Sequence, residues 1–227
     1  MVKKHSKRYK ESLKLIEKNK KYSLKEAISI LKKMPLPKFD PSVDLHFQLN
    51  VDTKRSDQQV RGTVILPHGT GKKLRIAVFC KGEAEREAKE AGADFVGGFE
   101  LIEKVEKGFL DFDCTVATPE MMRDLAKLGK ILGPRGLMPS PKTGTVTNEV
   151  RKAIEELRKG KIEFKVDKQA GLHLSIGKLS FDEEKLYENA LKLIEAINEA
   201  KPATVKGKFI KSIYISSTMN PGLQIQM

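Results

Sequence analysis

The middle of the chain alternates short apolar segments with short amphipathic ones. The apolar segments are LRIAVFC (74–80), ADFVGG (93–98) and FDCTVAT (112–118), and the amphipathic ones are EAEREAKEAG (83–92), FELIEKVEKG (99–108) and PEMMRDLAKLG (119–129). Such alternation is typical of a parallel sheet flanked by helices. A small Rossmann-like domain with three αβα layers is therefore predicted for residues 68–159, ending in a Pro/Gly/Lys-rich loop and a last helix.

Both ends of the chain show a different pattern, in which apolar and polar residues alternate. This pattern occurs in VDLHFQLNVD (43–52), VRGTVILP (60–67), KIEFKVD (161–167), GLHLSIG (171–177) and FIKSIYISS (209–217). It predicts strands that are buried on one face only. Two or three such strands are marginal alone, so we expect residues 1–67 and 160–227 to form one discontinuous α+β domain that carries the middle domain as an insertion. The first two strands are expected to pair with each other as an antiparallel hairpin.

Three helices are expected outside the middle segment, and capping boxes mark the start of two of them. The first helix is expected over about 6–20. The second begins at Ser23, whose hydroxyl can accept from the amide of Glu26 while the Glu26 carboxylate reaches back. Ser180 and Glu183 repeat this capping box before a long amphipathic helix that ends near Ala200.

The composition is strongly basic. Lys and Arg number 43 against 30 Asp and Glu, which gives a formal net charge of +13. Such an excess favours polyanionic partners, with nucleic acid first. A membrane partner is not expected, because no apolar run is long enough to span a bilayer and the basic residues are scattered. The segment MVKKHSKRYK (1–10) has no apolar run after its basic start, unlike a secretory signal, and Glu11 and Glu17 follow soon, unlike an acid-poor presequence, so a cytoplasmic location is expected.

Residues typical of catalysis or metal binding are dispersed. Cys80 and Cys114 are expected to be buried free thiols. The four histidines His5, His46, His68 and His173 show no metal-ligand spacing, and HGTGKK (68–73) lacks the residues of a phosphate-binding loop. No catalytic residue, metal or cofactor is therefore expected. An RNA-modifying or nucleotide-using enzyme, built on the middle domain, remains the alternative class.

Three segments carry residues suited to RNA. In GPRGLMPSPKTGTV (133–146), Arg135 and Lys142 stand among Gly and Pro residues, either as an RNA contact or as a solvated linker. Lys38 and Phe39 pair a cation with an aromatic ring that either stacks on a base or caps the core. SSTMNPG (216–222) offers hydroxyls, an unbranched Met and a turn, where the alternative is a strand that frays into a polar terminus.

Five segments, spread over nearly the whole chain, resemble one family. They are KFDPSVDLH, VRGTVILPHGTGK, GPRGLMPSPKTGTVT, VDKQAGLHLSIGKLSF and SSTMNPG, and they are similar to the bacterial large-subunit ribosomal protein L-one family. The resemblance implies a non-enzymatic, ribosome-associated protein that binds the ribosomal RNA stalk near the transfer-RNA exit site. It also implies repression of translation through the protein's own messenger RNA, transient contact with exit-site transfer RNA, and a monomer off the ribosome.

The resemblance also implies which residues face RNA. In the discontinuous domain they are Lys38, Phe39, Ser42, Asp44, Lys168, His173, Ser216, Thr218, Met219 and Gly222. Secondary contacts in the inserted domain are Arg135, Lys142 and Thr143. Three positions depart from the family pattern: Ser42 replaces an expected Thr, Asn220 replaces an expected Gly, and DKQAG (167–171) replaces a Lys-Thr-Gly turn. Asn tolerates a left-handed backbone and Ser keeps the hydroxyl, so these changes are compatible with binding.

Overall fold

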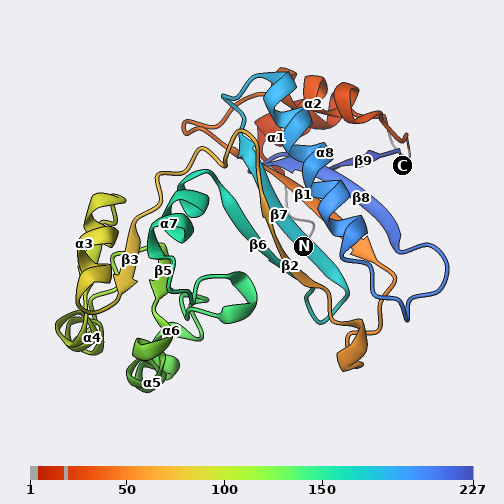
Figure 1. The fold of residues 1–227 in the computed structure, drawn as a ribbon. Coiled ribbons are helices and arrows are strands. Elements are labelled where there is room, and N and C mark those ends of the chain that lie inside the picture. Colours follow the sequence, from red (N-terminus) through yellow and green to blue (C-terminus); the bar gives the residue numbers. More distant parts are fainter. Residues whose placement is uncertain (1–4, 18–19, 227) are drawn as a thin grey trace. The chain divides into compact units, whose positions relative to one another are not determined.

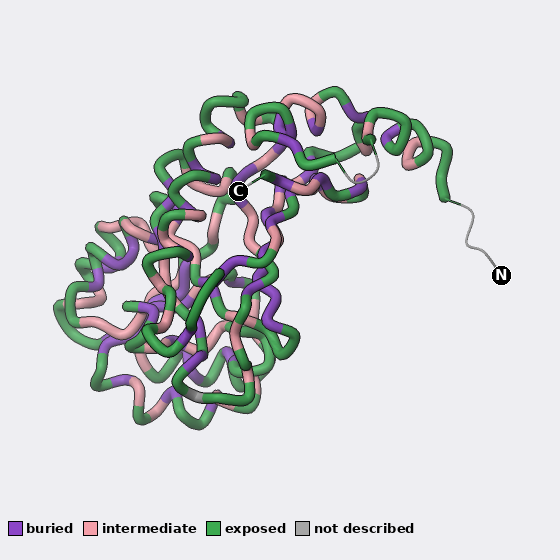
Figure 2. The backbone as a smooth tube through the Cα atoms, turned by 90° about the vertical axis from the view of Figure 1, so that its right-hand side faces the viewer, coloured by how far each residue is buried: buried purple, intermediate pink, exposed green. Residues whose placement is uncertain are grey.

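The structure, a computed structural model, describes residues 5–17 and 20–226 (Figure 1). The chain is of the mixed α/β class with several sheets, as the sequence predicted. It divides into two compact units, residues 1–71 with 162–227 and residues 72–161. Figure 2 shows buried residues within both units.

The first unit contains a four-stranded antiparallel sheet with the order β7-β1-β8-β9. Its strands are β1 (Ser42–Leu49), β7 (Gly171–Lys178), β8 (Ile210–Ser217) and β9 (Leu223–Ile225). Along β1, buried apolar residues alternate with more exposed polar ones, as expected of a strand with one buried face. The strand β9 was not predicted, because three residues give too short a pattern to recognise.

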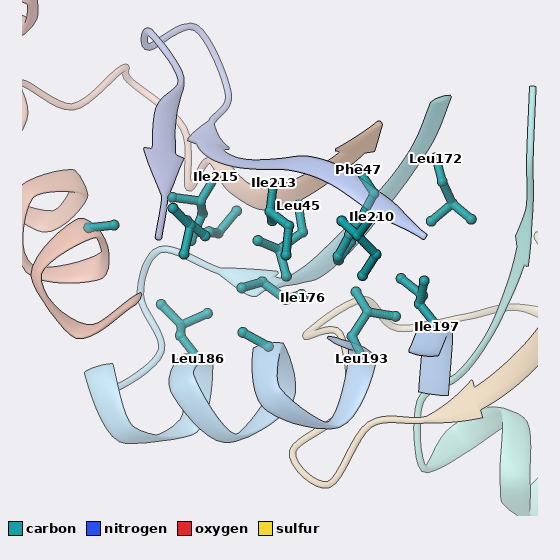
Figure 3. Close-up of a cluster of buried hydrophobic side chains, with 14 of the residues drawn as sticks. Leu45, Phe47, Leu172, Ile176, Leu186, Leu193, Ile197, Ile210, Ile213 and Ile215 are labelled. Carbon is teal, nitrogen blue, oxygen red and sulfur yellow. The ribbon is translucent and has the colours of Figure 1, made fainter. Parts of the chain in front are cut away.

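Two helices, α2 (Leu24–Lys33) and α8 (Glu183–Glu199), contribute to the core on the apolar face of this sheet. Figure 3 shows Leu45 and Phe47 of β1 packed with Ile213 of β8 and Leu193 of α8. The predicted capping box at Ser23 and Glu26 is confirmed, with both of its hydrogen bonds present. One face of the sheet is therefore closed by helices, and its polar side chains point away from them.

The predicted hairpin between the first two strands is wrong. Strand β2 (Arg61–Ile65) instead forms a separate two-stranded sheet with β6 (Lys161–Lys165). The reason is that β1 is central in the larger sheet, where β7 and β8 occupy both of its hydrogen-bonding edges. The two strands of the small sheet lie close, since a Cβ added at Gly62 would be 2.6 Å from Cζ of Phe164.

Two helix boundaries also differ from expectation. Helix α1 (Lys7–Lys14) begins after Ser6 as predicted but ends at Leu15, because the Glu17 amide donates to the Tyr22 hydroxyl rather than extending the helix. Residues 18–19 of the predicted helix lie outside the described residues.

The predicted capping box at Ser180 and Glu183 is wrong as well. The N-cap of α8 is Asp182, and the Ser180 hydroxyl instead donates to the Asp40 carboxylate at 2.8 Å.

The second unit contains a three-stranded parallel sheet with the order β4-β3-β5. Its strands are β3 (Ile76–Phe79), β4 (Phe95–Gly97) and β5 (Cys114–Ala117); its helices are α3 (Glu83–Glu90), α4 (Phe99–Glu106), α5 (Met122–Leu125), α6 (Gly129–Leu132) and α7 (Val150–Arg158). Successive residues of β3 belong to different core clusters: Ala77 and Phe79 pack with α4, α5 and α6, whereas Ile76 and Val78 pack with α3 and α7. Helices therefore cover both faces of this sheet, which explains why its strands are apolar throughout.

The two thiols lie in the second unit. Both cysteines are free; Cys80 is buried and Cys114 is half-buried. Burial raises the pKa of Cys80 to about 11 and also raises the pKa of Cys114. Thiols that stay protonated at neutral pH are poor nucleophiles, so neither is suited to covalent catalysis.

Candidate nucleic-acid interface

The polar face of the four-stranded sheet brings together residues from distant parts of the chain. Asp44 of β1 lies opposite Ser175 of β7 and Ser216 of β8. In the next row, His46 lies opposite His173 and Tyr214. Because every second residue of a strand points to the same side, these carboxylate, imidazole and hydroxyl groups share one surface. It can donate and accept hydrogen bonds over three adjacent strands.

At the centre of this face, two histidines connect β1 with its two neighbouring strands. His46 Nδ1 lies 3.0 Å from His173 Nδ1, and His46 Nε2 lies 2.9 Å from Ser216 Oγ. The second ring nitrogen of His173 faces Asp167 Oδ2 at 3.8 Å. Burial and then the neighbouring His173 lower the pKa of His46, against the opposing effect of Asp44. The His46 imidazole is therefore mainly neutral at pH 7.

The segment SSTMNPG forms the turn between β8 and β9 rather than a frayed strand end. Thr218 Oγ1 accepts from the Ser42 amide at 3.1 Å and donates to the Ser42 carbonyl at 3.3 Å. These bonds join residues that are 176 positions apart. They fix the turn beside the start of β1, which places two of the RNA-facing segments implied by the resemblance side by side.

The backbone of this turn explains the Asn at position 220. Met219, and not Asn220, has the left-handed backbone, with φ of 72°, and its side chain is 63% exposed. Asn220 Nδ2 donates to Ser217 Oγ at 2.9 Å, and its Oδ1 accepts from Ser12 Oγ of α1 at 3.2 Å. The Asn side chain therefore ties the turn to α1, which a Gly there could not do. A left-handed Met costs on the order of 1 kcal/mol, and such strain is often found at functional sites.

The loop before β1 carries the exposed pair Lys38 and Phe39. Phe39 is 51% exposed, so the alternative in which it caps the core is wrong. The loop is held in place by Asp40, which accepts from Ser180, and by Lys178 Nζ, which donates to Ser42 Oγ at 3.0 Å. An exposed ring on a fixed loop is available for stacking on a base.

The turn DKQAG leads into β7. Asp167 Oδ1 accepts from the amides of Gln169 and Gly171 at 2.8 and 2.7 Å, and Ala170 adopts a left-handed backbone. Lys168 is exposed at the tip of this turn. Asp167 therefore supplies the turn-forming hydrogen bonds while its other oxygen faces His173.

The basic loop of the second unit carries two cations. Arg135 and Lys142 are exposed. Thr143 is 5% exposed, and its hydroxyl donates to the Ser140 carbonyl at 2.9 Å. The Thr143 side chain therefore shapes the loop, and within this loop the exposed cations are the groups free to meet a phosphate.

Sequence reasoning placed His46 on a polar strand face but did not include it among the binding residues. Its partners are set by the strand register, which the sequence does not show. A second missed feature is the row of exposed lysines Lys7, Lys10 and Lys14 on α1, recognisable from their i, i+3, i+7 spacing. The bond between Ser12 and Asn220 holds this helix beside the β8–β9 turn.

Replacing Thr218 with Val is expected to lower both stability and RNA affinity. The Ser42 amide would lose its side-chain acceptor, which costs about 1 to 3 kcal/mol of unfolding free energy. Urea unfolding measured beside RNA affinity tests this, with Thr218→Ser as the control that keeps the hydroxyl. Unchanged unfolding with weakened binding would instead mean that the hydroxyl acts directly on RNA.

Within residues 5–17 and 20–226, no three His, Cys, Asp or Glu side chains are grouped so that they could hold a metal ion. No helix in that part of the chain is long and apolar enough to cross a bilayer.

The chain is similar to proteins of one family. The model of the "Ribosomal protein L1p/L10e family" matches residues 20–221. The "Large ribosomal subunit protein uL1" of Thermosipho africanus (strain TCF52B) is 55% identical over 223 residues, which are 98% of this chain and 96% of the relative. Proteins of the same name from Thermosipho melanesiensis and Kosmotoga olearia are each 53% identical, over 98% of this chain and 96% of the relative.

Proposed function

Because the chain belongs to the ribosomal protein L1p/L10e family, we propose that it binds the stalk of the large-subunit ribosomal RNA through the polar face and the β8–β9 turn of its first unit. Membership of this family makes it a structural ribosomal protein rather than an enzyme, located in the cytoplasm with the ribosome. The enzyme alternative is therefore set aside. Binding to RNA agrees with the net charge of +13.

One observation carries the proposed site. Thr218 and Ser42, from opposite ends of the chain, are hydrogen-bonded to each other. Exposed Phe39 lies three residues before Ser42, and exposed Met219 directly follows Thr218. The bond therefore joins the two segments that carry these side chains. Bases and riboses offer surfaces that match both an exposed apolar side chain and a neighbouring hydroxyl.

The contacts proposed in this unit are those of Lys38, Phe39, Ser42, Asp44, Lys168, His173, Ser216, Thr218, Met219 and Gly222. The Thr218 hydroxyl bonds the backbone of Ser42, so it acts mainly by holding the turn, whereas the Ser42 hydroxyl accepts from Lys178. In the second unit, Arg135 and Lys142 supply secondary phosphate contacts, and Thr143 keeps their loop in shape.

The two compact units are proposed to be two domains, the second a Rossmann-like insertion. The sequence predicted the domain boundaries between residues 67 and 68 and between residues 159 and 160. We propose 71–72 and 161–162, because Asn189 of α8 accepts from the His68 amide and donates to the Gly69 carbonyl. These two residues are thereby part of the first unit.

Three further roles are proposed from the family resemblance. They are repression of translation through the protein's own messenger RNA, transient contact with exit-site transfer RNA, and a monomeric state off the ribosome.

Affinity for a stalk transcript is expected to fall with salt less steeply than for a protein that clamps many phosphates. Hydroxyl, aromatic and Met contacts release few counterions, so the slope of log K against log salt should be shallower than roughly −6 to −10. Filter binding between about 50 and 400 mM salt measures this slope. A random duplex of equal length serves as competitor. A steep slope with no preference for the stalk would reduce the protein to a general basic RNA binder.

A further inference from the structure

We propose that His46 determines which groups of RNA the Ser216 hydroxyl can recognise, by fixing the direction in which that hydroxyl donates its proton. This inference rests on the proposed function, because it concerns the same face of the sheet. Ser216 is assigned there as an RNA contact, whereas His46 has had no role.

The proton positions follow from the geometry of the two rings. The His46 Nδ1 and His173 Nδ1 atoms are 3.0 Å apart, so one proton lies between them. The Asp167 carboxylate, at 3.8 Å from His173 Nε2, favours a proton on that nitrogen. With its proton on Nε2, His173 accepts at Nδ1, and His46 donates to it from Nδ1.

This arrangement leaves His46 Nε2 without a proton. Because that nitrogen is 2.9 Å from Ser216 Oγ, it must accept from the hydroxyl. The only proton of Ser216 is then directed into the protein, and its lone pairs are left for a ligand. Ser216 in this state can accept from a ribose 2′-hydroxyl, but it cannot donate to a phosphate oxygen. The surface thus selects ribose over deoxyribose.

A second proton on the histidine pair reverses this polarity. Protonated His46 still donates from Nδ1 to His173, but its Nε2 now also donates, so Ser216 becomes the acceptor of the bond between His46 Nε2 and Ser216 Oγ. Its hydroxyl proton can then point outward, toward a phosphate. The groups that face the pair are Asp44 on β1, Asp167 before β7 and Tyr214 on β8. Since burial lowers the pKa of His46, the reversal belongs to pH values below the ordinary histidine range.

The test is a 2′-deoxy scan of the stalk transcript at about pH 4.5 and pH 7.5, roughly two units below and one unit above the ordinary histidine pKa. We expect one or a few positions where deoxyribose weakens binding by about five- to tenfold at the higher pH, the effect of one lost hydrogen bond. At the lower pH this ratio should approach one. Comparing two RNAs at the same pH removes the general increase in affinity that added positive charge brings.

Two variants make the test specific. His46→Phe keeps a planar ring but removes both nitrogens, so Ser216 can also donate outward, and the preference for ribose at those positions should weaken and become the same at both pH values. Ser216→Ala should abolish it at the same positions, and it serves if the His46 variant does not fold by circular dichroism. The control is His68→Gln, because His68 bonds Glu188 of α8 and not the polar face; it should keep both the ratio and its pH dependence.

The outcomes separate the inference from the function it rests on. A ribose preference that is unchanged in His46→Phe, or that does not vary with pH in the unmodified protein, overturns the inference. Selective stalk binding without any ribose-sensitive position also overturns it. Absence of stalk selectivity at both pH values overturns the proposed function itself.

Discussion

Replacing residues 72–161 with a short Gly/Ser linker is expected to leave a folded protein that still selects stalk RNA. The first unit has its own core, formed by the four-stranded sheet with α2 and α8. The two cut ends follow β2 and precede most of β6, which are hydrogen-bonded neighbours, so a short linker can join them. Affinity should fall by about tenfold or less, since only the secondary grip of Arg135 and Lys142 is lost.

The position of the cut gives a matched control. Removing residues 68–159 instead would take away the His68 amide and the Gly69 carbonyl, two partners of the buried Asn189 side chain. Leaving such groups unpaired costs about 1 to 3 kcal/mol each. The variant that lacks residues 68–159 should therefore unfold at a lower urea concentration than the variant that lacks residues 72–161, although both keep the four-stranded sheet.

The excised segment tests the division between the units. Expressed alone, residues 72–161 should fold around the parallel sheet and bind RNA weakly, with no preference for the stalk. Circular dichroism and filter binding measure both properties. Stalk-selective binding by this segment would place the main site in the second unit and contradict the assignment to the first.

The sequence predicted what depends on neighbouring residues. Alternation along β1 identified its buried and polar faces, and the Ser23 capping box marked the start of α2, because both patterns are complete within a few residues. Apolar strands such as β3 likewise indicated a sheet covered on both faces.

The early end of α1 has a local cause, since Glu17 and Tyr22 are five positions apart, but the other two errors involve residues distant in the sequence. Ser180 was assigned to a helix cap because Glu183 is nearby, but its hydroxyl binds Asp40, 140 positions away. The hairpin of the first two strands was inferred from a short polar loop, whereas β1 has partners from the other end of the chain. Local pattern favours local pairing, and here long-range strand pairing prevails.

The same limit applies to the candidate site. Motifs indicated Met219 and Phe39, and the structure shows both exposed. The pair of His46 and His173 depends on the register between β1 and β7, which a one-residue slip would destroy. Thr143 was implied by its place in a basic loop, yet its burial is decided by the fold of that loop.

Replacing both Phe39 and Met219 with Ala is expected to weaken stalk binding by about thirtyfold or more, if each of the two contacts contributes about 1 to 3 kcal/mol, the range for a base stacked on an aromatic ring. Both side chains are more than half exposed, at 51% and 63%, so their removal should leave the core unchanged. Affinity by filter binding and stability by urea unfolding should therefore separate. The single variants should show whether the two losses add, as expected if they contact different nucleotides.

Phe99 supplies the control, because it is an exposed Phe in the other unit. It is 52% exposed, and Lys81 Nζ lies 3.9 Å from its ring centroid. Phe99→Ala removes the same amount of aromatic surface, so any general contribution of exposed rings to RNA binding would appear in it equally. We expect less than a threefold loss for this variant (about 0.6 kcal/mol). Equal losses in Phe99→Ala and Phe39→Ala would show that the loop before β1 is not a specific stacking site, and the interface would then have to be sought among the charged residues alone.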